Sequence, residues 1–340
     1  MTTVAPQKHA PKDYASDQEL RWCPGCGDYA IIKGVQKALA DLNVDTARTV
    51  FVSGIGCAAR FPYYMSTYGF HSIHGRAPAV ATGVKLANPE LDVWVISGDG
   101  DALSIGGNHL IHLLRRNVDL QFLLFNNEIY GLTKGQYSPT SRVGTLSPST
   151  PQGSIDTPVS ACELALGAGA RFVARCIDIQ QPRLVEVMKR AHAHHGTSFV
   201  EIFQNCVVFN DEAFGHFTAK DVAVDRQLHA EHGAPLRWGK NAEHGLRFNQ
   251  KAMVLEAVTV GDPGVSELDI LVHDETNRTM AQMLIGLEPP SFPVVLGVIY
   301  CNQAATTYER DVHAQAAAAG APTDDLTALL RRGQTWEVMG

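Results

Sequence analysis

Hydrophobic positions in the first 210 residues follow two patterns in turn, helical spacing and short apolar runs with few polar breaks. Helical spacing predicts helices at residues 30–42, 77–87, 104–115, 158–167 and 182–194. Apolar and β-branched runs predict strands at residues 49–53, 91–96, 120–125, 171–177 and 198–203. Such strands, alternating with helices, are typical of a parallel sheet covered on both faces. The expected fold class is therefore α/β, with a doubly wound parallel sheet.

The chain outside this alternation has a different character. Residues 1–21 are polar and are expected to form an N-terminal arm, and Asp28 is the expected N-cap of the first helix. Residues 211–290 are polar, with clustered Asp, Glu, His and Arg, and residues 291–340 form a tail of unknown role. We expect 211–340 to be a C-terminal appendage that wraps on the sheet domain or on a partner.

Composition excludes several classes of protein. The formal net charge is -7 and no block of lysine or arginine occurs, which argues against a nucleic-acid partner. The N-terminus lacks the apolar core of a signal peptide, and the longest apolar stretch is far shorter than a membrane span. We therefore expect a soluble, cytoplasmic protein with no membrane partner. In that compartment, seven cysteines indicate metal ligands or core thiols rather than disulfides.

The run GDGD at 98–101 is the first candidate site. It follows a predicted strand, and Asn127 follows the next one, so both lie at the edge where open α/β sheets bind ligands. The glycines on either side of Asp99 let the backbone approach a phosphate. The Asp99 carboxylate, the Asn127 amide oxygen and the Ile129 carbonyl are oxygen ligands suited to Mg²⁺. Asp-Gly and Asn-Asn also occur in ordinary turns, but together, after two buried strands, they favour a metal site.

Four cysteines are the second candidate site. They are Cys23, Cys26, Cys57 and Cys206. The CxxC pair is similar to a thioredoxin-like redox motif, but it does not follow a buried strand. Four thiolates can also bind Zn²⁺ or a cubane iron–sulfur cluster, and the sequence alone separates these poorly. The other three cysteines, Cys162, Cys176 and Cys301, have apolar neighbours and are expected to be core residues.

Three further side chains are candidates for catalytic contacts. His74 precedes a predicted helix whose N-terminus is a natural anion site. Lys134 lies in the long loop at 126–153, and loops of that length inside a compact domain are usually functional. Near a cofactor, Lys134 becomes a candidate partner for a substrate carboxylate, and Arg60 is a weaker candidate of the same kind.

Five motifs, in the same order, resemble the β subunits of 2-oxoacid:ferredoxin oxidoreductases. GDGD followed by NNEIYGLTKGQYSPTS is similar to the thiamine-diphosphate motif of that family. The other motifs are WCPGCGDYAIIKG, SGIGCAARFPYY, GFHSIHGRA and QNCVVFN. The resemblance covers residues 20–210 closely and extends loosely to about 290. It departs from the family at positions 58 and 59, where both residues are alanine and family members often carry serine.

The resemblance implies a set of cofactors and ligands in a domain at 22–210. It implies a [4Fe–4S] cluster on the four cysteines of the second site, and Mg²⁺ on Asp99, Asn127 and the carbonyl of Ile129. The residues it implies for thiamine diphosphate are Ile55, Gly56, Cys57, Ala58, His74, Gly98, Gly100, Asp101, Gly131 and Leu132.

The resemblance also implies an activity and partners. The activity is coenzyme A-dependent oxidative decarboxylation of a 2-oxoacid, with electrons passed through the cluster to ferredoxin, and the reverse reaction is possible. A separate α subunit would complete the active site in an αβ or (αβ)₂ assembly. The segments RFPYY and LTKGQYSPTS look more like the 2-oxoglutarate branch, which forms succinyl-CoA, than the pyruvate branch. A non-redox thiamine enzyme with structural zinc and a non-catalytic scaffold remain alternatives.

Overall fold

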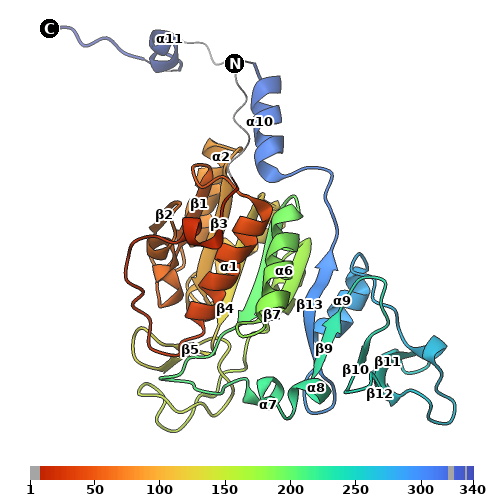
Figure 1. The fold of residues 1–340 in the computed structure, drawn as a ribbon. Coiled ribbons are helices and arrows are strands. Elements are labelled where there is room, and N and C mark those ends of the chain that lie inside the picture. The colour runs from red at the N-terminus through yellow and green to blue at the C-terminus, as the bar shows by residue number, and fades with distance from the viewer. Residues whose placement is uncertain (1–7, 321–324, 334) are drawn as a thin grey trace.

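One eight-stranded sheet forms the centre of the protein. The structure is a computed structural model and describes residues 8–320, 325–333 and 335–340. The strands are β1 (Thr49–Ser53), β2 (Tyr68–His71), β3 (Asp92–Gly98), β4 (Leu120–Asn126), β7 (Phe172–Ile177), β8 (Thr197–Phe203), β9 (Gln227–Ala230) and β13 (Val294–Cys301). They lie in the order β2-β1-β3-β4-β8-β7-β13-β9 (Figure 1). All neighbours are parallel except β13 with β7.

Helices cover both faces of this sheet. In the described residues the α-helices are α1 (Asp28–Leu42), α2 (Ala77–Ala87), α3 (Asp99–Leu103), α4 (Gly107–Arg116), α5 (Ala161–Gly167), α6 (Gln181–Ala193), α7 (Gly215–Thr218), α8 (Ala223–Arg226), α9 (Arg278–Ile285), α10 (Tyr308–Ala318) and α11 (Leu326–Leu330). One hydrophobic core contains residues of α1 and α6, and another contains residues of α2, α4, α5 and α9. The expected doubly wound α/β class is therefore confirmed.

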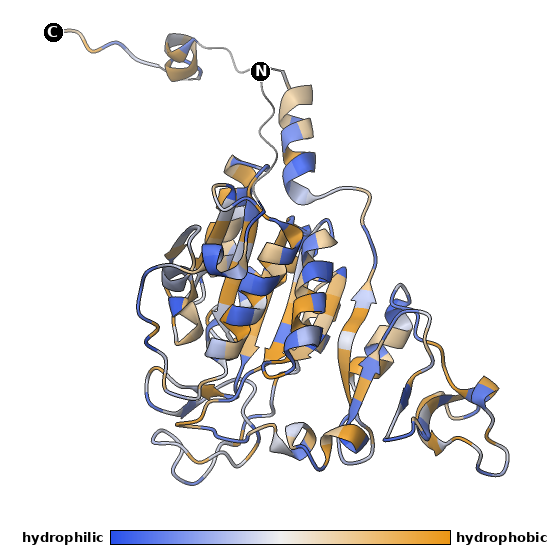
Figure 2. Cartoon of the chain, viewed as in Figure 1, coloured by the Kyte–Doolittle hydropathy of each residue, from blue (hydrophilic) through white to orange (hydrophobic). Residues whose placement is uncertain are grey.

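The strands are apolar throughout because successive residues enter different cores. In β3, Val93 and Val95 pack with α2 and α4, whereas Trp94 and Ile96 pack with α1 and α6. Alternation of side chains across a strand makes both faces of a central strand apolar when helices cover both sides. The hydrophobic colouring of the central strands in Figure 2 follows from this arrangement.

Several boundaries differ from the expectation. The expected helix at 104–115 corresponds to α4, which begins only at Gly107. The short helix α3, at Asp99–Leu103, and the strand β2 were not expected. Asp28 is not the N-cap of α1, because that position belongs to Gly27. A Cβ atom on Gly27 would lie 2.0 Å from Asp178 Oδ2, so the chain needs glycine here, and Asp28 enters the helix with a buried side chain.

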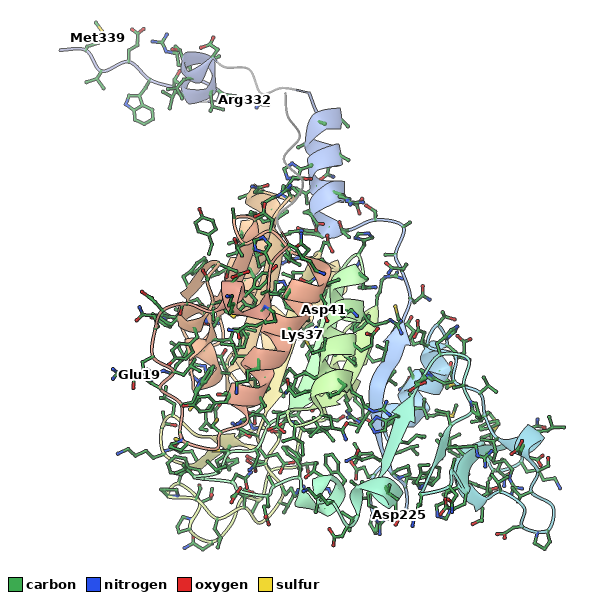
Figure 3. All side chains as sticks on the ribbon, viewed as in Figure 1. Glu19, Lys37, Asp41, Asp225, Arg332 and Met339 are labelled. Carbon is green, nitrogen blue, oxygen red and sulfur yellow. The ribbon has the colours of Figure 1, made fainter. Side chains whose placement is uncertain are left out.

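Residues 211–340, expected as an appendage, also contribute two strands to the sheet itself. β13 pairs with β7 and with β9, and Val295 and Leu296 on β13 are at most 1% exposed. A small antiparallel sheet of β10 (Arg237–Trp238), β11 (His244–Asn249) and β12 (Val254–Thr259) follows β9 in the chain. After β13 the chain leaves the sheet, and Arg332 and Met339 lie on an extension well away from it (Figure 3).

None of the helices in the described ranges is long and apolar enough to span a bilayer.

The position of β13 generates a test of stability. We expect Leu296→Ala to lower the free energy of unfolding by about 2–5 kcal/mol, because it leaves a cavity in a close-packed core. The matched control is Leu329→Ala in α11, where the side chain is 60% exposed, and its effect should stay within about 0.5 kcal/mol. Urea unfolding midpoints measure both. Equal effects of the two substitutions would contradict the placement of β13 in the core.

Candidate functional site

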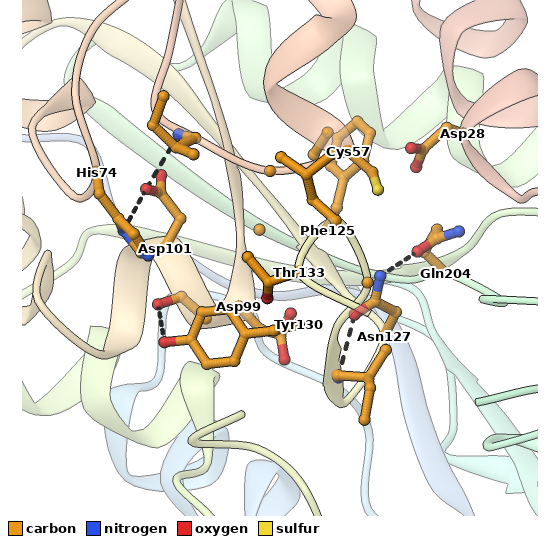
Figure 4. A pocket seen from close by; sticks show the side chains of 18 residues that line it. Asp28, Cys57, His74, Asp99, Asp101, Phe125, Asn127, Tyr130, Thr133 and Gln204 are labelled. Carbon is orange, nitrogen blue, oxygen red and sulfur yellow. Dashed lines mark hydrogen bonds and ion pairs between the residues drawn. The ribbon is translucent and has the colours of Figure 1, made fainter. Parts of the chain in front are cut away.

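A cavity that opens to solvent lies at the carboxyl ends of β1, β3 and β4 (Figure 4). This is the edge at which parallel α/β sheets bind ligands, because the loops after neighbouring strands converge there. Thirteen residues expected at the site line this cavity. They are Ile55, Gly56, Cys57, Ala58, His74, Gly98, Asp99, Gly100, Asp101, Asn127, Ile129, Gly131 and Leu132.

Asp101 joins three of the segments that form the cavity wall. Its Oδ1 accepts hydrogen bonds from the backbone N–H groups of Ile55 (3.1 Å) and Gly75 (2.7 Å), and it lies 2.9 Å from His74 Nδ1. Its Oδ2 accepts a hydrogen bond from Ser97 Oγ at 2.5 Å. A buried carboxylate is tolerated when it is hydrogen-bonded in this way. Asp101 therefore fixes the loop after β1 against the start of α2 and orients His74.

Asp99 has different surroundings although it is only two residues away. Its side chain is 2% exposed, and its Oδ2 accepts hydrogen bonds from Ser138 Oγ (2.5 Å) and Thr140 Oγ1 (2.7 Å). Burial raises the pKa of the Asp99 carboxyl, and the two hydroxyl donors oppose that rise. A buried carboxylate that borders a cavity is a suitable ligand for a small divalent cation.

Asn127 and Ile129 supply the neutral oxygens next to Asp99. The Asn127 side-chain N–H donates to Gln204 Oε1 (2.7 Å), and its Oδ1 accepts from the Ile129 backbone N–H (3.2 Å). These contacts are drawn in Figure 4 and fix which end of the amide is the oxygen. One carboxylate, one amide oxygen and one carbonyl lining the same cavity form a donor set that fits Mg²⁺, with phosphate and water completing the coordination.

Gly100 is required by the close approach of an aromatic ring. A Cβ atom at this position would lie 2.4 Å from the Tyr130 ring, whose hydroxyl donates to the Gly100 carbonyl at 2.8 Å. Tyr130 lies on β5 (Ile129–Tyr130), which forms a short hairpin with β6 (Gln136–Tyr137). The turn of this hairpin places Gly131, Leu132 and Thr133 in the cavity wall.

The four cysteines of the second site come from three parts of the chain and lie next to this cavity. Cys57 lines the cavity, and a Cβ atom on Gly131 would lie 3.7 Å from Cys57 Sγ and 3.6 Å from Cys206 Sγ. Cys26 belongs to a tight turn in which its N–H donates to the Cys23 carbonyl (3.0 Å). Gly25 adopts a φ of 87° in that turn, a conformation that favours glycine.

Burial and nearby negative charge disfavour the ionised form of two of these thiols, Cys26 and Cys57. Burial raises the pKa of Cys57 to about 11, and negative charge on Asp28, Cys206 and Cys23 adds to the effect. Burial and the same kind of neighbours also raise the pKa of Cys26. Thiolates held together in this way are stabilised when they bind cationic iron or zinc, so the thiols fit a metal centre.

A zinc site and an iron–sulfur cluster differ in the distance between the side chains that bind them. Within the residues that the structure describes, no three His, Cys, Asp or Glu side chains converge closely enough to hold a single metal ion. A tetrahedral zinc site, with Zn–S bonds near 2.3 Å, would need sulfurs about 3.8 Å apart. A cubane cluster binds its thiolates through separate iron atoms and needs them farther apart.

The remaining cysteines have other environments. Cys162 and Cys176 are buried in the two cores on opposite faces of the sheet, as expected for structural thiols. Cys301 is only half-buried at the end of β13.

Two expected site residues, Lys134 and Arg60, do not line the cavity. Lys134 follows Thr133 at the hairpin turn and is exposed. Arg60 lies two residues after Ala58, with its Nε 3.2 Å from Tyr64 Oη, and it lines a separate surface hollow with Glu19 and Arg21.

Other residues line the cavity without having been expected there. These are Asp28, Phe125, Tyr130, Thr133 and Gln204. Gln204 directly follows β8, so its position at the carboxyl edge of the sheet is the signal that would have found it. Asp28 has a buried Oδ1 without a hydrogen-bond partner, and burial raises its pKa to about 7.

Comparison with known proteins agrees with this geometry. The family model described as "Thiamine pyrophosphate enzyme, C-terminal TPP binding domain" matches residues 54–202. The chain is similar to a solved structure of 2-oxoglutarate:ferredoxin oxidoreductase from Magnetococcus marinus with 2-oxoglutarate, coenzyme A and succinyl-CoA bound. The TM-score is 0.77 and the identity 32%, and the match covers 97% of each chain.

Relatives share sequence over most of the chain. 2-Oxoglutarate synthase subunit KorB of Methanocaldococcus jannaschii is 41% identical over 254 residues, covering 74% of this chain and 92% of the relative. 2-Oxoglutarate oxidoreductase subunit KorB of Mycobacterium tuberculosis is 48% identical over 343 residues, covering 99% of this chain and 90% of the relative. Because this similarity spans nearly the whole chain, the protein belongs to the family of 2-oxoacid:ferredoxin oxidoreductase β subunits.

Proposed function

We propose that the chain is the β subunit of a 2-oxoglutarate:ferredoxin oxidoreductase that holds thiamine diphosphate, Mg²⁺ and a [4Fe–4S] cluster. The observation that carries this proposal is the position of Cys57. It lines the cavity that contains Asp99 and Asn127, and its thiol and that of Cys206 both lie near Gly131. A cluster bound there would adjoin the cofactor pocket. Electrons released in the pocket would then have a short path to the cluster.

The residues of the cavity divide the work of holding the cofactor. Asp99, Asn127 and the Ile129 carbonyl would hold Mg²⁺, which would neutralise negative charge on a diphosphate. When bound, thiamine diphosphate supplies the electron sink that makes loss of CO₂ from a 2-oxoacid feasible. Asp101 holds His74 at the cavity wall, where its side chain is 41% exposed and free to contact a bound anion. The apolar side chains of Phe125 and Ile55 also line the pocket.

The proposed reaction converts 2-oxoglutarate and coenzyme A to succinyl-CoA and CO₂, with electrons passed through the cluster to ferredoxin. The Mycobacterium and Methanocaldococcus relatives are named for 2-oxoglutarate, and the solved Magnetococcus structure holds 2-oxoglutarate and succinyl-CoA. Reductive carboxylation is the reverse of the same chemistry. Pyruvate or another 2-oxoacid is the alternative substrate, since other relatives are named only for 2-oxoacids.

The proposal includes a partner and a compartment. Relatives of this chain are named as β subunits, so an α subunit is the implied partner. We propose an αβ or (αβ)₂ assembly in the cytoplasm, where reducing conditions keep the four thiols free to bind iron.

We expect the anaerobically purified complex of this chain with its α subunit to reduce viologen in a coenzyme A-dependent reaction. The kcat/KM for 2-oxoglutarate should be much higher than for pyruvate. A preference for pyruvate would keep the mechanism but change the substrate. Failure with both, in protein that contains iron and thiamine diphosphate, would direct the search to other 2-oxoacids.

Alanine in place of Cys23, Cys26 or Cys206 should abolish the brown visible absorbance and the bound iron and sulfide. Cys162→Ala is the matched control and should retain them, because Cys162 is buried in the core that contains α2, α4, α5 and α9, whereas Cys26 and Cys57 pack against the other core. Chemical assay of iron and sulfide in the purified complex measures the effect. Stoichiometric zinc without sulfide in the unsubstituted protein would instead support the non-redox alternative.

Lys134 remains our candidate partner for the distal carboxylate of 2-oxoglutarate, since it adjoins Thr133 at the cavity mouth. Loss of a charge-assisted contact costs about 1.5–3 kcal/mol. Lys134→Ala should therefore raise KM for 2-oxoglutarate about tenfold or more and change KM for pyruvate little. Lys37→Ala on α1, which removes an exposed lysine paired with Asp41 (Figure 3), is the control. Equal losses on both substrates would refute this role for Lys134.

A further inference from the structure

The segment Ser138–Ser141, which directly follows β6, buries three hydroxyl groups next to the cavity. Ser138, Thr140 and Ser141 are 2%, 5% and 3% exposed, although they belong to a long polar loop. Buried hydroxyls in a loop need hydrogen-bond partners, because loss of water is otherwise unfavourable. Their partners here are Asp99 and the two residues that flank Asn127.

The first group is Asp99, at the end of β3. Ser138 Oγ and Thr140 Oγ1 both donate to Oδ2 of this carboxylate, at 2.5 and 2.7 Å. The two hydroxyls are themselves 3.1 Å apart, so they contact the carboxylate as a pair. Two donors on one oxygen fix the rotation of the carboxylate and leave Oδ1 without either hydroxyl.

The second group flanks Asn127, at the end of β4. Ser141 Oγ donates to the Glu128 carbonyl at 2.5 Å, and Thr140 Oγ1 lies 3.0 Å from Asn126 Oδ1. Since Thr140 has one hydroxyl proton, it donates either to Asp99 or to Asn126 at a given moment.

Asn126 is in turn fixed from the sheet side. Its Nδ2 donates to Glu201 Oε1 (2.8 Å), and Glu201 accepts from Arg175 Nε (2.8 Å). Glu201 is 2% exposed and lies on β8, in the middle of the sheet. The Ser138–Ser141 segment therefore connects the ends of β3 and β4 to each other and, through Asn126, to a buried ion pair.

We propose that Ser138, Thr140 and Ser141 are positioning residues. Their hydroxyls fix the relative positions of Asp99 and Asn127, the two side chains that would bind the divalent cation. Mg²⁺ requires near-ideal octahedral geometry, so a small rotation of a ligating carboxylate weakens binding. Substitution of groups that orient metal ligands typically lowers metal affinity about 10- to 100-fold. This inference rests on the proposed function, since it assigns supporting residues to the metal site of that proposal.

The test compares two substitutions at one position. Thr140→Val keeps the shape of the side chain and removes its hydroxyl, whereas Thr140→Ser keeps the hydroxyl. The αβ complex is freed of metal and cofactor, and Mn²⁺ is titrated with saturating thiamine diphosphate while electron paramagnetic resonance reports free Mn²⁺. We expect Thr140→Val to raise the Kd for Mn²⁺ at least tenfold and Thr140→Ser to stay within about threefold of the parent.

Thr197→Val is the matched control for loss of a buried hydroxyl. Thr197 is fully buried at the start of β8, where its hydroxyl donates to the Val118 carbonyl (2.7 Å) at the opposite edge of the sheet. The Thr197→Val substitution should lower the midpoint temperature of thermal unfolding without changing the Kd for Mn²⁺. If Thr140→Val does not fold, Ser138→Ala replaces it and should also raise that Kd.

Three outcomes would overturn the proposal. A Kd for Mn²⁺ unchanged by Thr140→Val would show that the hydroxyl does not position the ligands. An equal rise in Thr197→Val would show a general effect of destabilisation. A parent complex without metal-dependent thiamine diphosphate binding would instead refute the proposed function, and this inference would fall with it.

Discussion

The buried carboxylate of Asp101 is the interaction on which the rest of the site depends. It accepts hydrogen bonds from the backbone of Ile55 and of Gly75 and from the hydroxyl of Ser97. These partners come from the loop after β1, the segment before α2 and the end of β3. The approach is so close that a Cβ atom on Gly54 would lie 1.8 Å from Asp101 Oδ2. A carboxylate at this depth needs hydrogen-bond donors, and the donors that bind Asp101 hold three cavity segments in one arrangement.

The two carboxylates of the GDGD run show how one short motif serves two purposes. Both Asp99 and Asp101 lie in the first turn of α3. Two backbone N–H groups and the nearby Ser97 hydroxyl donate to Asp101, whereas hydroxyls of a distant loop donate to Asp99. Asp101 therefore shapes the protein, whereas Asp99 keeps an oxygen available to a ligand. The parallel sheet makes this division possible, because the ends of β3 and β4 lie side by side at one edge.

The same edge brings together thiols that are far apart in sequence. Cys57 follows β1 and Cys206 follows β8, whereas Cys23 and Cys26 precede α1. Cys57 both lines the cavity and is one of the four thiols, so the organic cofactor and the metal centre of the proposed enzyme would lie next to each other. No other part of the fold is needed to connect them, and β9 and β13 extend the sheet on the side away from β1.

Local patterns in the sequence determined the fold class and much of the site, because alternating strands and helices and the GDGD and CxxC motifs are encoded by neighbouring residues. They also predicted which strand ends line the cavity. Only the tertiary structure decided the hydrogen-bond partners of Ser138, Thr140 and Gln204, because a polar residue in a loop looks the same in sequence whether it faces solvent or a buried carboxylate. The pairing of β13 with β7 was likewise undetermined, since a contact across more than one hundred residues leaves no local pattern. Burial and long-range partners, rather than residue type, distinguish these polar residues from polar residues on the surface.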